Sequence, residues 1–69
     1  MNLTNTRLIE LGWTETSFEG HTFLVNGDRV LVNIAGVWAL GRYIFNEPYI
    51  PLSNPIYVNS EEQLNRLLQ

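Results

Sequence analysis

The chain has 69 residues, no cysteine, a single histidine and a formal net charge of −3. This length gives one domain, residues 1–69, which buries only roughly 60% of its unfolded surface. The absence of cysteine excludes disulfides and thiolate metal sites. The four arginines are scattered singly and there is no lysine, which argues against nucleic-acid binding, because that binding draws on clustered cations.

Charged residues make up 16% of the chain, below the roughly 25% of typical soluble domains. With so few charges to cover the surface, some apolar residues are expected to meet another chain, and we expect a homo-oligomer. No signal peptide is visible, because the N-terminus lacks a basic segment followed by an apolar one. No apolar run approaches the roughly 20 residues that span a bilayer. These features predict a cytoplasmic protein that does not bind a membrane.

The first predicted element is a short helix over residues 3–11, in which leucines recur at helical spacing. Asn2 or Thr4 is its predicted N-cap, and Gly12 is its predicted C-cap. Residues 14–17 are polar and predict a connector.

A β-hairpin is predicted over residues 18–34, because Asn26-Gly27 separates two runs of β-branched and aromatic residues. We expect these two residues to form the loop, so that Val25 faces Asp28 across it. The side chains of alternate residues then share a face of the sheet.

A second turn is predicted at Ala35-Gly36, followed by a third strand over residues 37–45. Alanine suits a type I′ turn poorly, so a longer or bulged turn stays open here. Residues 46–55 hold all three prolines and predict a loop that crosses the surface or one edge of the sheet.

Residues 56–58 predict a short fourth strand. Ser60 and Gln63 then match a capping box, with Ser60 at the N-cap of a final helix that carries one leucine stripe. The predicted fold class is α+β: an antiparallel meander of three to four strands, flanked by a short N-terminal helix and a C-terminal helix.

Both faces of the predicted sheet are apolar. One is rich in β-branched residues, and the other carries Leu31, Trp38 and Leu40, diluted by polar residues such as Arg42. Two short helices are modest cover for two faces. Either each helix packs on a different face, or both pack on the β-branched face and leave the Trp38 face open as an interface. The alternative is that the chain's own loop and helices cover Trp38. The predicted interface comprises Leu31, Trp38, Leu40, Arg42 and Tyr49, and the proline-rich loop is a second contact candidate.

No residue set predicts catalysis, a cofactor or a metal. His21 is the only histidine, and a strand histidine is usually a hydrogen-bonding residue. The carboxylates fall in a connector, a strand, a loop and a helix cap, so no pair is predicted for acid–base work. Gly36 and Gly41 flank a strand, which fits turn geometry or close packing better than a phosphate loop. We therefore expect no enzyme.

The segments RLIELGW (7–13) and IYVNSEEQLNRLL (56–68) together resemble small uncharacterised phage and prophage proteins of gut bacteria. The resemblance is confined to the two ends of the chain. It implies a viral accessory protein, and one common role of such proteins is to bind and disable a host defence component. It assigns no functional residue.

These observations predict a small non-enzymatic protein-interaction module. We expect a viral accessory protein that self-associates, or that binds and inhibits a host defence protein in the host cytoplasm. The alternative is a small-ligand-binding or sequestering protein whose pocket forms between subunits. A flat aromatic patch would favour the first function, and a buried polar cavity between subunits would favour the second.

Overall fold

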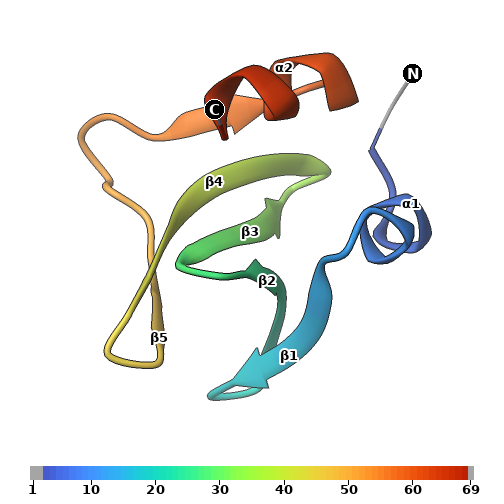
Figure 1. Cartoon of the computed structure of the whole chain (residues 1–69). Helices are drawn as coiled ribbons and strands as arrows, with labels where there is room; N and C mark the ends of the chain where they lie inside the picture. The colour runs from blue at the N-terminus through green and yellow to red at the C-terminus, as the bar shows by residue number, and fades with distance from the viewer. Residues whose placement is uncertain (1–2, 69) are drawn as a thin grey trace.

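A computed structural model describes residues 3–68 and shows an α+β fold (Figure 1). A curled antiparallel sheet is preceded by one short helix and followed by another, which confirms the predicted fold class. The described residues form six strands, more than the three or four expected. Neither described helix is long and apolar enough to cross a bilayer. In chain order the elements are α1 (Asn5–Glu10), β1 (Thr14–Phe18), β2 (His21–Asn26), β3 (Arg29–Ile34), β4 (Val37–Ile44), β5 (Glu47–Tyr49), β6 (Ile56–Val58) and α2 (Glu61–Leu67).

Two of the strands lie where the sequence predicted none. Strand β1 replaces the predicted connector at 14–17 and pairs only with β2, so its polar side chains stand largely in solvent, as suits an edge strand. Strand β5 lies within the proline-rich segment and pairs with the second half of β4. Pro48 is tolerated there because an edge position does not need its missing N–H.

The predicted β2–β3 hairpin forms, but its register differs from the prediction. Asn26 pairs with Arg29, so the loop residues are Gly27 and Asp28. Gly27 has a φ of +65°, which favours glycine at the first position of a tight turn. The difference in register is two residues, so the side chains of β2 and β3 keep their predicted faces. The predicted first strand began at Phe18, but Glu19-Gly20 turns the chain, and Phe18 instead ends β1 opposite His21.

The other hairpins also have two-residue loops. In each loop both residues have positive φ, as a type I′ turn requires. Ala35-Gly36 therefore forms the tight turn and not the longer one, and its Gly36 N–H donates to Asn33 Oδ1 over 3.0 Å. The three loops are Glu19-Gly20, Ala35-Gly36 and Phe45-Asn46.

The predicted helix caps are present. Thr4 Oγ1 accepts a hydrogen bond from a backbone N–H in the first turn of α1 (3.1 Å), and Ser60 Oγ accepts one from the Gln63 N–H (3.2 Å). The Gln63 side chain also accepts from the Asn59 N–H and donates to the Tyr57 carbonyl oxygen, each over 3.0 Å. This side chain thus ties α2 to β6.

The Leu-Gly-Trp step ends α1 as a Schellman motif. Gly12 has a φ of +109°, its N–H donates to the Ile9 carbonyl, and the Trp13 N–H donates to the Leu8 carbonyl. Leu8 and Trp13 are both buried, so the cap also turns the tryptophan into the core.

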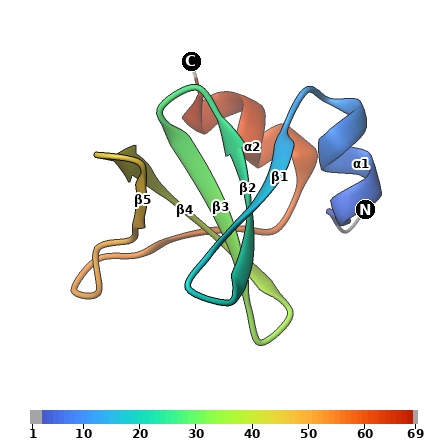
Figure 2. The same cartoon turned by 90° about the horizontal axis from the view of Figure 1, so that it is seen from below.

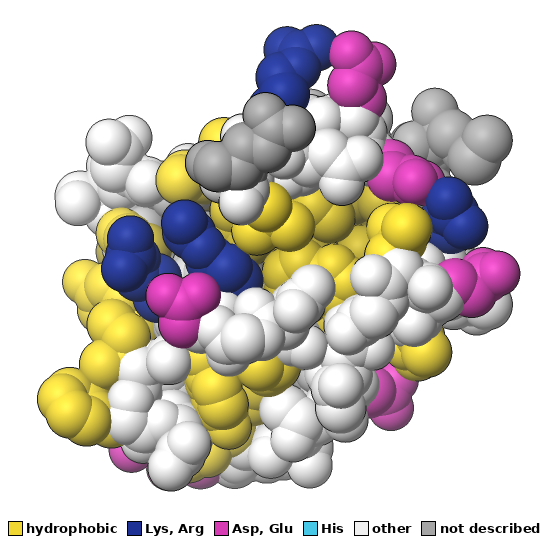
Figure 3. Space-filling view, viewed as in Figure 1, with side chains coloured by type: hydrophobic (Ala, Val, Ile, Leu, Met, Phe, Trp, Pro, Cys, Tyr) yellow, Lys and Arg dark blue, Asp and Glu magenta, His cyan; other side chains and the backbone are white. Residues whose placement is uncertain are grey.

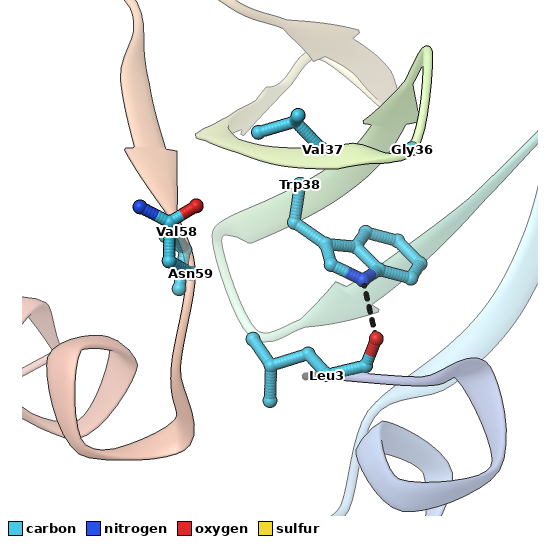
Figure 4. Close-up of a pocket in the computed structure, with 6 residues that line it drawn as sticks. All are labelled: Leu3, Gly36, Val37, Trp38, Val58 and Asn59. Carbon is cyan, nitrogen blue, oxygen red and sulfur yellow. Dashed lines mark hydrogen bonds between the residues drawn. The ribbon is translucent and has the colours of Figure 1, made fainter. Parts of the chain in front are cut away.

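Both helices pack on the Trp38 face of the sheet. The Trp38 Nε1–H donates to the Leu3 carbonyl oxygen over 3.1 Å, which fixes the segment before α1 to β4 (Figure 4). Of the two alternatives for this face, the open one is wrong and the covered one is confirmed, because α1 and α2 both cover Trp38. The buried cluster comprises Leu3, Leu8, Trp13, Leu24, Leu31, Trp38, Leu40, Val58 and Leu64, with Leu67 packed against it.

Neither of the two helices within residues 3–68 packs on the β-branched face. Its centre is covered by its own side chains: Phe23 and Tyr43 pack ring against ring with centroids 5.9 Å apart, and Phe23, Val30 and Ala39 are buried. The chain after β5 also crosses this face, at Gly41, where an added Cβ would meet the Tyr49 carbonyl oxygen. Gly41 therefore serves close packing, one of the two roles predicted for it.

Candidate interaction surface

Strand β4 carries one row of side chains from the core to the surface. Trp38 and Leu40 are buried under the helices, whereas Arg42 and Ile44, further along the same side of the strand, are exposed. The second half of β4 extends with β5 away from both helices (Figures 1 and 2). The same sheet face is thus core at one end of the strand and surface at the other.

Large apolar side chains are exposed at this protruding end and in the loop that follows it. Phe45, in the β4–β5 turn, is 90% exposed, and Leu52, in the following loop, is 96% exposed. Figure 3 shows hydrophobic side chains protruding over the β4–β5 hairpin, at the lower left, with cationic side chains and one acidic side chain above them. We call the exposed apolar residues of this region the hairpin surface: Ile44, Phe45, Tyr49, Leu52 and Ile56.

The backbone at Phe45 does not explain why a phenylalanine is present. Its φ is +53°, and Asn46 follows at +62°. A bulky residue at positive φ is an outlier, whereas glycine, asparagine or aspartate adopt this conformation at lower cost. Because the ring is also almost fully exposed, neither local conformation nor core packing favours it. Strained residues of this kind are concentrated at functional sites.

A hollow of about 220 Å³ adjoins the hairpin surface. This volume is smaller than the roughly 300–1,000 Å³ of typical small-molecule sites. It is of a size to receive a single side chain. Its lining includes Arg29, Leu40, Arg42, Ile44, Tyr49 and Ile56.

Two arginines stand side by side at this hollow. Arg29 on β3 is directly opposite Arg42 on β4, and Tyr49 on β5 is the next residue across. Like charges at opposed sheet positions repel each other. Within residues 3–68 the ion pairs are Arg7–Glu61 and Arg66–Glu62, and neither involves these two guanidinium groups.

The Arg7–Glu61 pair lies elsewhere and connects the two helices. Arg7 Nε and Nη2 donate to the two Glu61 carboxylate oxygens over 3.0 and 2.9 Å. This hydrogen bonding lowers the pKa of Glu61 below its ordinary value. The pair therefore holds α1 to α2 beside the core and does not contribute to the hairpin surface.

The five predicted interface residues divide between core and surface. Leu31, Trp38 and Leu40 are at most 5% exposed within one chain, so they are core residues, and of the three only Leu40 also lines the hollow beside the hairpin surface. Arg42 and Tyr49 are exposed beside the hollow, in or next to the proline-rich segment that was the second contact candidate.

Phe45 and Leu52 were not among the predicted interface residues. Their sequence signal is an apolar residue at a position that ordinarily takes a polar one: Phe45 in a turn, and Leu52 between Pro51 and Ser53 in a loop. His21 begins β2 next to a turn and is exposed. No group of three metal-ligating side chains occurs in the described part of the chain.

A second hollow, also about 220 Å³, lies at the other end of β4 (Figure 4). No ionisable side chain lines it. The Trp38 indole N–H beside it already donates to the Leu3 carbonyl oxygen. The hollow therefore offers no acid, base or nucleophile. Its lining residues are Leu3, Gly36, Val37, Trp38, Val58 and Asn59.

Comparison with known proteins adds no relative: no family model matches the chain, and searches of curated proteins and of solved structures return no match.

Proposed function

We propose that the chain is a non-enzymatic protein-interaction module that contacts its partner through the hairpin surface. The observation that carries the proposal is the exposure of two large apolar side chains, Phe45 in the β4–β5 turn at 90% and Leu52 in the loop after β5 at 96%. Large exposed apolar side chains gathered in one region are typical of protein contact sites. Aromatic side chains are also the residues that most often anchor such sites.

The geometry of the region supports protein binding over the alternative of a small-ligand pocket. The hairpin surface protrudes, and the hollow beside the two arginines is of side-chain size. A further hollow of about 320 Å³ at the β4–β5 turn lies only at the lower limit of the size of small-molecule sites. A small-molecule site is usually a larger concave cavity that surrounds its ligand. A convex apolar hairpin flanked by a small hollow instead suits a partner that places one anchor side chain into the hollow and packs around it.

The proposal has two forms: the chain associates with itself, or it binds a different protein. Sedimentation velocity over a range of concentrations tests the self-associating form. In the self-associating form, the Phe45→Asn/Leu52→Ser double variant sediments as a smaller species than the wild type. The matched control is Ile9→Ser, which removes a half-exposed apolar side chain from α1, away from this surface. If both variants and the wild type sediment as monomers, the self-associating form is wrong.

The form that binds another protein is tested by selection from a displayed library of random peptides on the immobilised wild type. We expect selected peptides to bind the wild type and the Ile9→Ser control and to lose binding to the double variant. Peptides that bind all three proteins equally would show that the hairpin surface is not the contact.

A host defence protein as the partner stays a prediction that rests on the resemblance to phage proteins. The two segments that carry this resemblance have structural roles, since they form α1 with its cap, and β6 with the cap and body of α2. The hairpin surface lies almost entirely in the middle of the chain, between these segments.

A further inference from the structure

We propose that the partner segment recognised by the hairpin surface presents an apolar side chain next to a carboxylate, the apolar side chain entering the hollow and the carboxylate binding Arg29 and Arg42. This inference rests on the proposed function and adds the chemistry of the partner. It follows from the charge, the size and the register of the hollow.

The charge of the hollow is opposite to that of the whole chain. The protein carries a formal net charge of −3, yet Arg29 and Arg42 place two positive charges at adjacent sheet positions. Opposed like charges destabilise a sheet, so folding does not account for this arrangement. A carboxylate between them would relieve the repulsion, and a guanidinium group is suited to bind it through two parallel hydrogen bonds.

The apolar part of the hollow sets the second requirement. Leu40, Ile44 and Ile56 line it beside the two arginines, so an occupant with only a charge would leave these side chains in poor contact. The volume of about 220 Å³ suits one side chain. An apolar residue adjacent to Asp or Glu satisfies both parts of the site at once.

The neighbouring aromatic side chains extend the contact beyond the hollow. Tyr49 pairs with Arg42 in the sheet and lines the hollow, and Phe45 follows Ile44 in the adjoining turn. Single-stranded nucleic acid also combines aromatic and cationic contacts. It requires a row of cations along its backbone, however, and this surface has only one pair.

The test uses the peptides selected on the wild type. We expect them to share an apolar residue adjacent to Asp or Glu, and we expect Arg42→Gln and Arg29→Gln each to weaken their binding by about tenfold, as the loss of a charged hydrogen bond predicts. Arg42→Lys keeps the charge without the planar fork and should give an intermediate affinity. Arg66→Gln on α2 makes the same charge change at an exposed position and should bind as the wild type does.

The folded state of each variant is checked by circular dichroism; removal of either arginine relieves repulsion, so we expect the variants to fold. Three outcomes overturn the inference. In the first, the selected peptides need Phe45 and Leu52 but lack an acidic preference and bind both Gln variants as tightly as the wild type. This result overturns the inference and leaves the proposed function standing. The absence of any peptide that depends on the hairpin surface overturns both. Tight binding of a single-stranded oligonucleotide in place of the peptides would also contradict it.

Discussion

The two halves of β4 carry one continuous row of side chains with opposite outcomes. Along one side of the strand, Trp38 and Leu40 are buried, and two residues further on the row continues as exposed Arg42 and Ile44. Alternation along a strand fixes which side chains share a face. It does not fix which part of that face another element covers. The difference between the halves is the reach of two short helices.

The chain can expose this much apolar surface and still fold because its core does not include the β4–β5 turn. The first half of β4 lies in the buried cluster with side chains from both helices, so the core is complete without the hairpin. The second half, with β5 and the loop after it, is therefore free to carry residues such as Phe45 that contribute nothing to that core.

The largest expected effect tests the buried half. Trp38→Ala removes a buried indole and its hydrogen bond to Leu3, and the loss should be about 3–5 kcal/mol of unfolding free energy. Leu52→Ala removes a side chain that is 96% exposed and should change stability by less than about 0.5 kcal/mol. Chemical denaturation followed by circular dichroism measures both. If Trp38→Ala does not fold, Trp38→Phe provides the milder comparison, and equal stability of the Trp38 and Leu52 variants would show that the two halves do not differ.

The second prediction concerns the point where the chain crosses β4. In Gly41→Ala the new methyl would meet the Tyr49 carbonyl oxygen and lie 2.8 Å from Ile50 Cγ1. Overpacking of this kind costs roughly 1–3 kcal/mol. We expect faster amide hydrogen exchange in β5, while β2 and β3 keep their protection. Equal protection of β5 in the variant and the wild type would contradict the close crossing.

The third prediction has the opposite sign. Phe45→Asn places a residue that tolerates positive φ at a strained turn position, and it removes only an exposed ring, so stability should rise by up to about 1 kcal/mol. Phe45→Ala keeps the backbone penalty and should leave the melting temperature close to that of the wild type. A lower melting temperature for Phe45→Asn would mean that the ring packs within the chain and that the hairpin surface is not free.

Local features of the fold could be predicted from the sequence because they depend on neighbouring residues. The capping residues Thr4 and Ser60, the glycine that ends α1 and the face of each strand residue follow from spacing and side-chain chemistry. Strand β1 could not be predicted in this way, because an edge strand exposed to solvent needs no apolar alternation, and its residues read as a connector.

The candidate surface was predictable only in part, because burial depends on contacts between distant elements. The leucine stripes show that both helices are amphipathic, but which sheet face they cover depends on how the chain enters β1 and leaves β6. Leu31 and Leu40 were therefore assigned to an interface although they are core residues. The proline-rich segment was expected to be a loop over the surface or along one edge of the sheet; it contains the edge strand β5, and it contributes Tyr49 and Leu52 to the hairpin surface.

The smallest expected effect tests the helix pair that covers the buried half. Arg7 and Glu61 join α1 to α2, and the hydrogen bond from Arg7 lowers the pKa of Glu61 from its ordinary value of 4.5. The pKa is lower in the folded state than in the unfolded state. The stabilisation is therefore fully present above pH 4.5, and it is lost as the pH falls through the lowered value. The hydrogen bond to Glu61 raises the pKa of the Arg7 guanidinium further above its already high ordinary value, so its titration lies far outside this range.

We accordingly expect Glu61→Gln to melt slightly below the wild type at neutral pH and to converge with it in strong acid, where the wild-type carboxylate is itself protonated. Both side chains are partly exposed, so the effect should be small and should shrink as salt is added. Glu62→Gln is the matched control, because Glu62 pairs with Arg66 within one helix and at high exposure. A Glu61→Gln difference that persists unchanged in acid would show that the ion pair is not its cause. The helices would then be held on the Trp38 face by apolar packing and by the Trp38–Leu3 hydrogen bond, without a contribution from the Arg7–Glu61 pair.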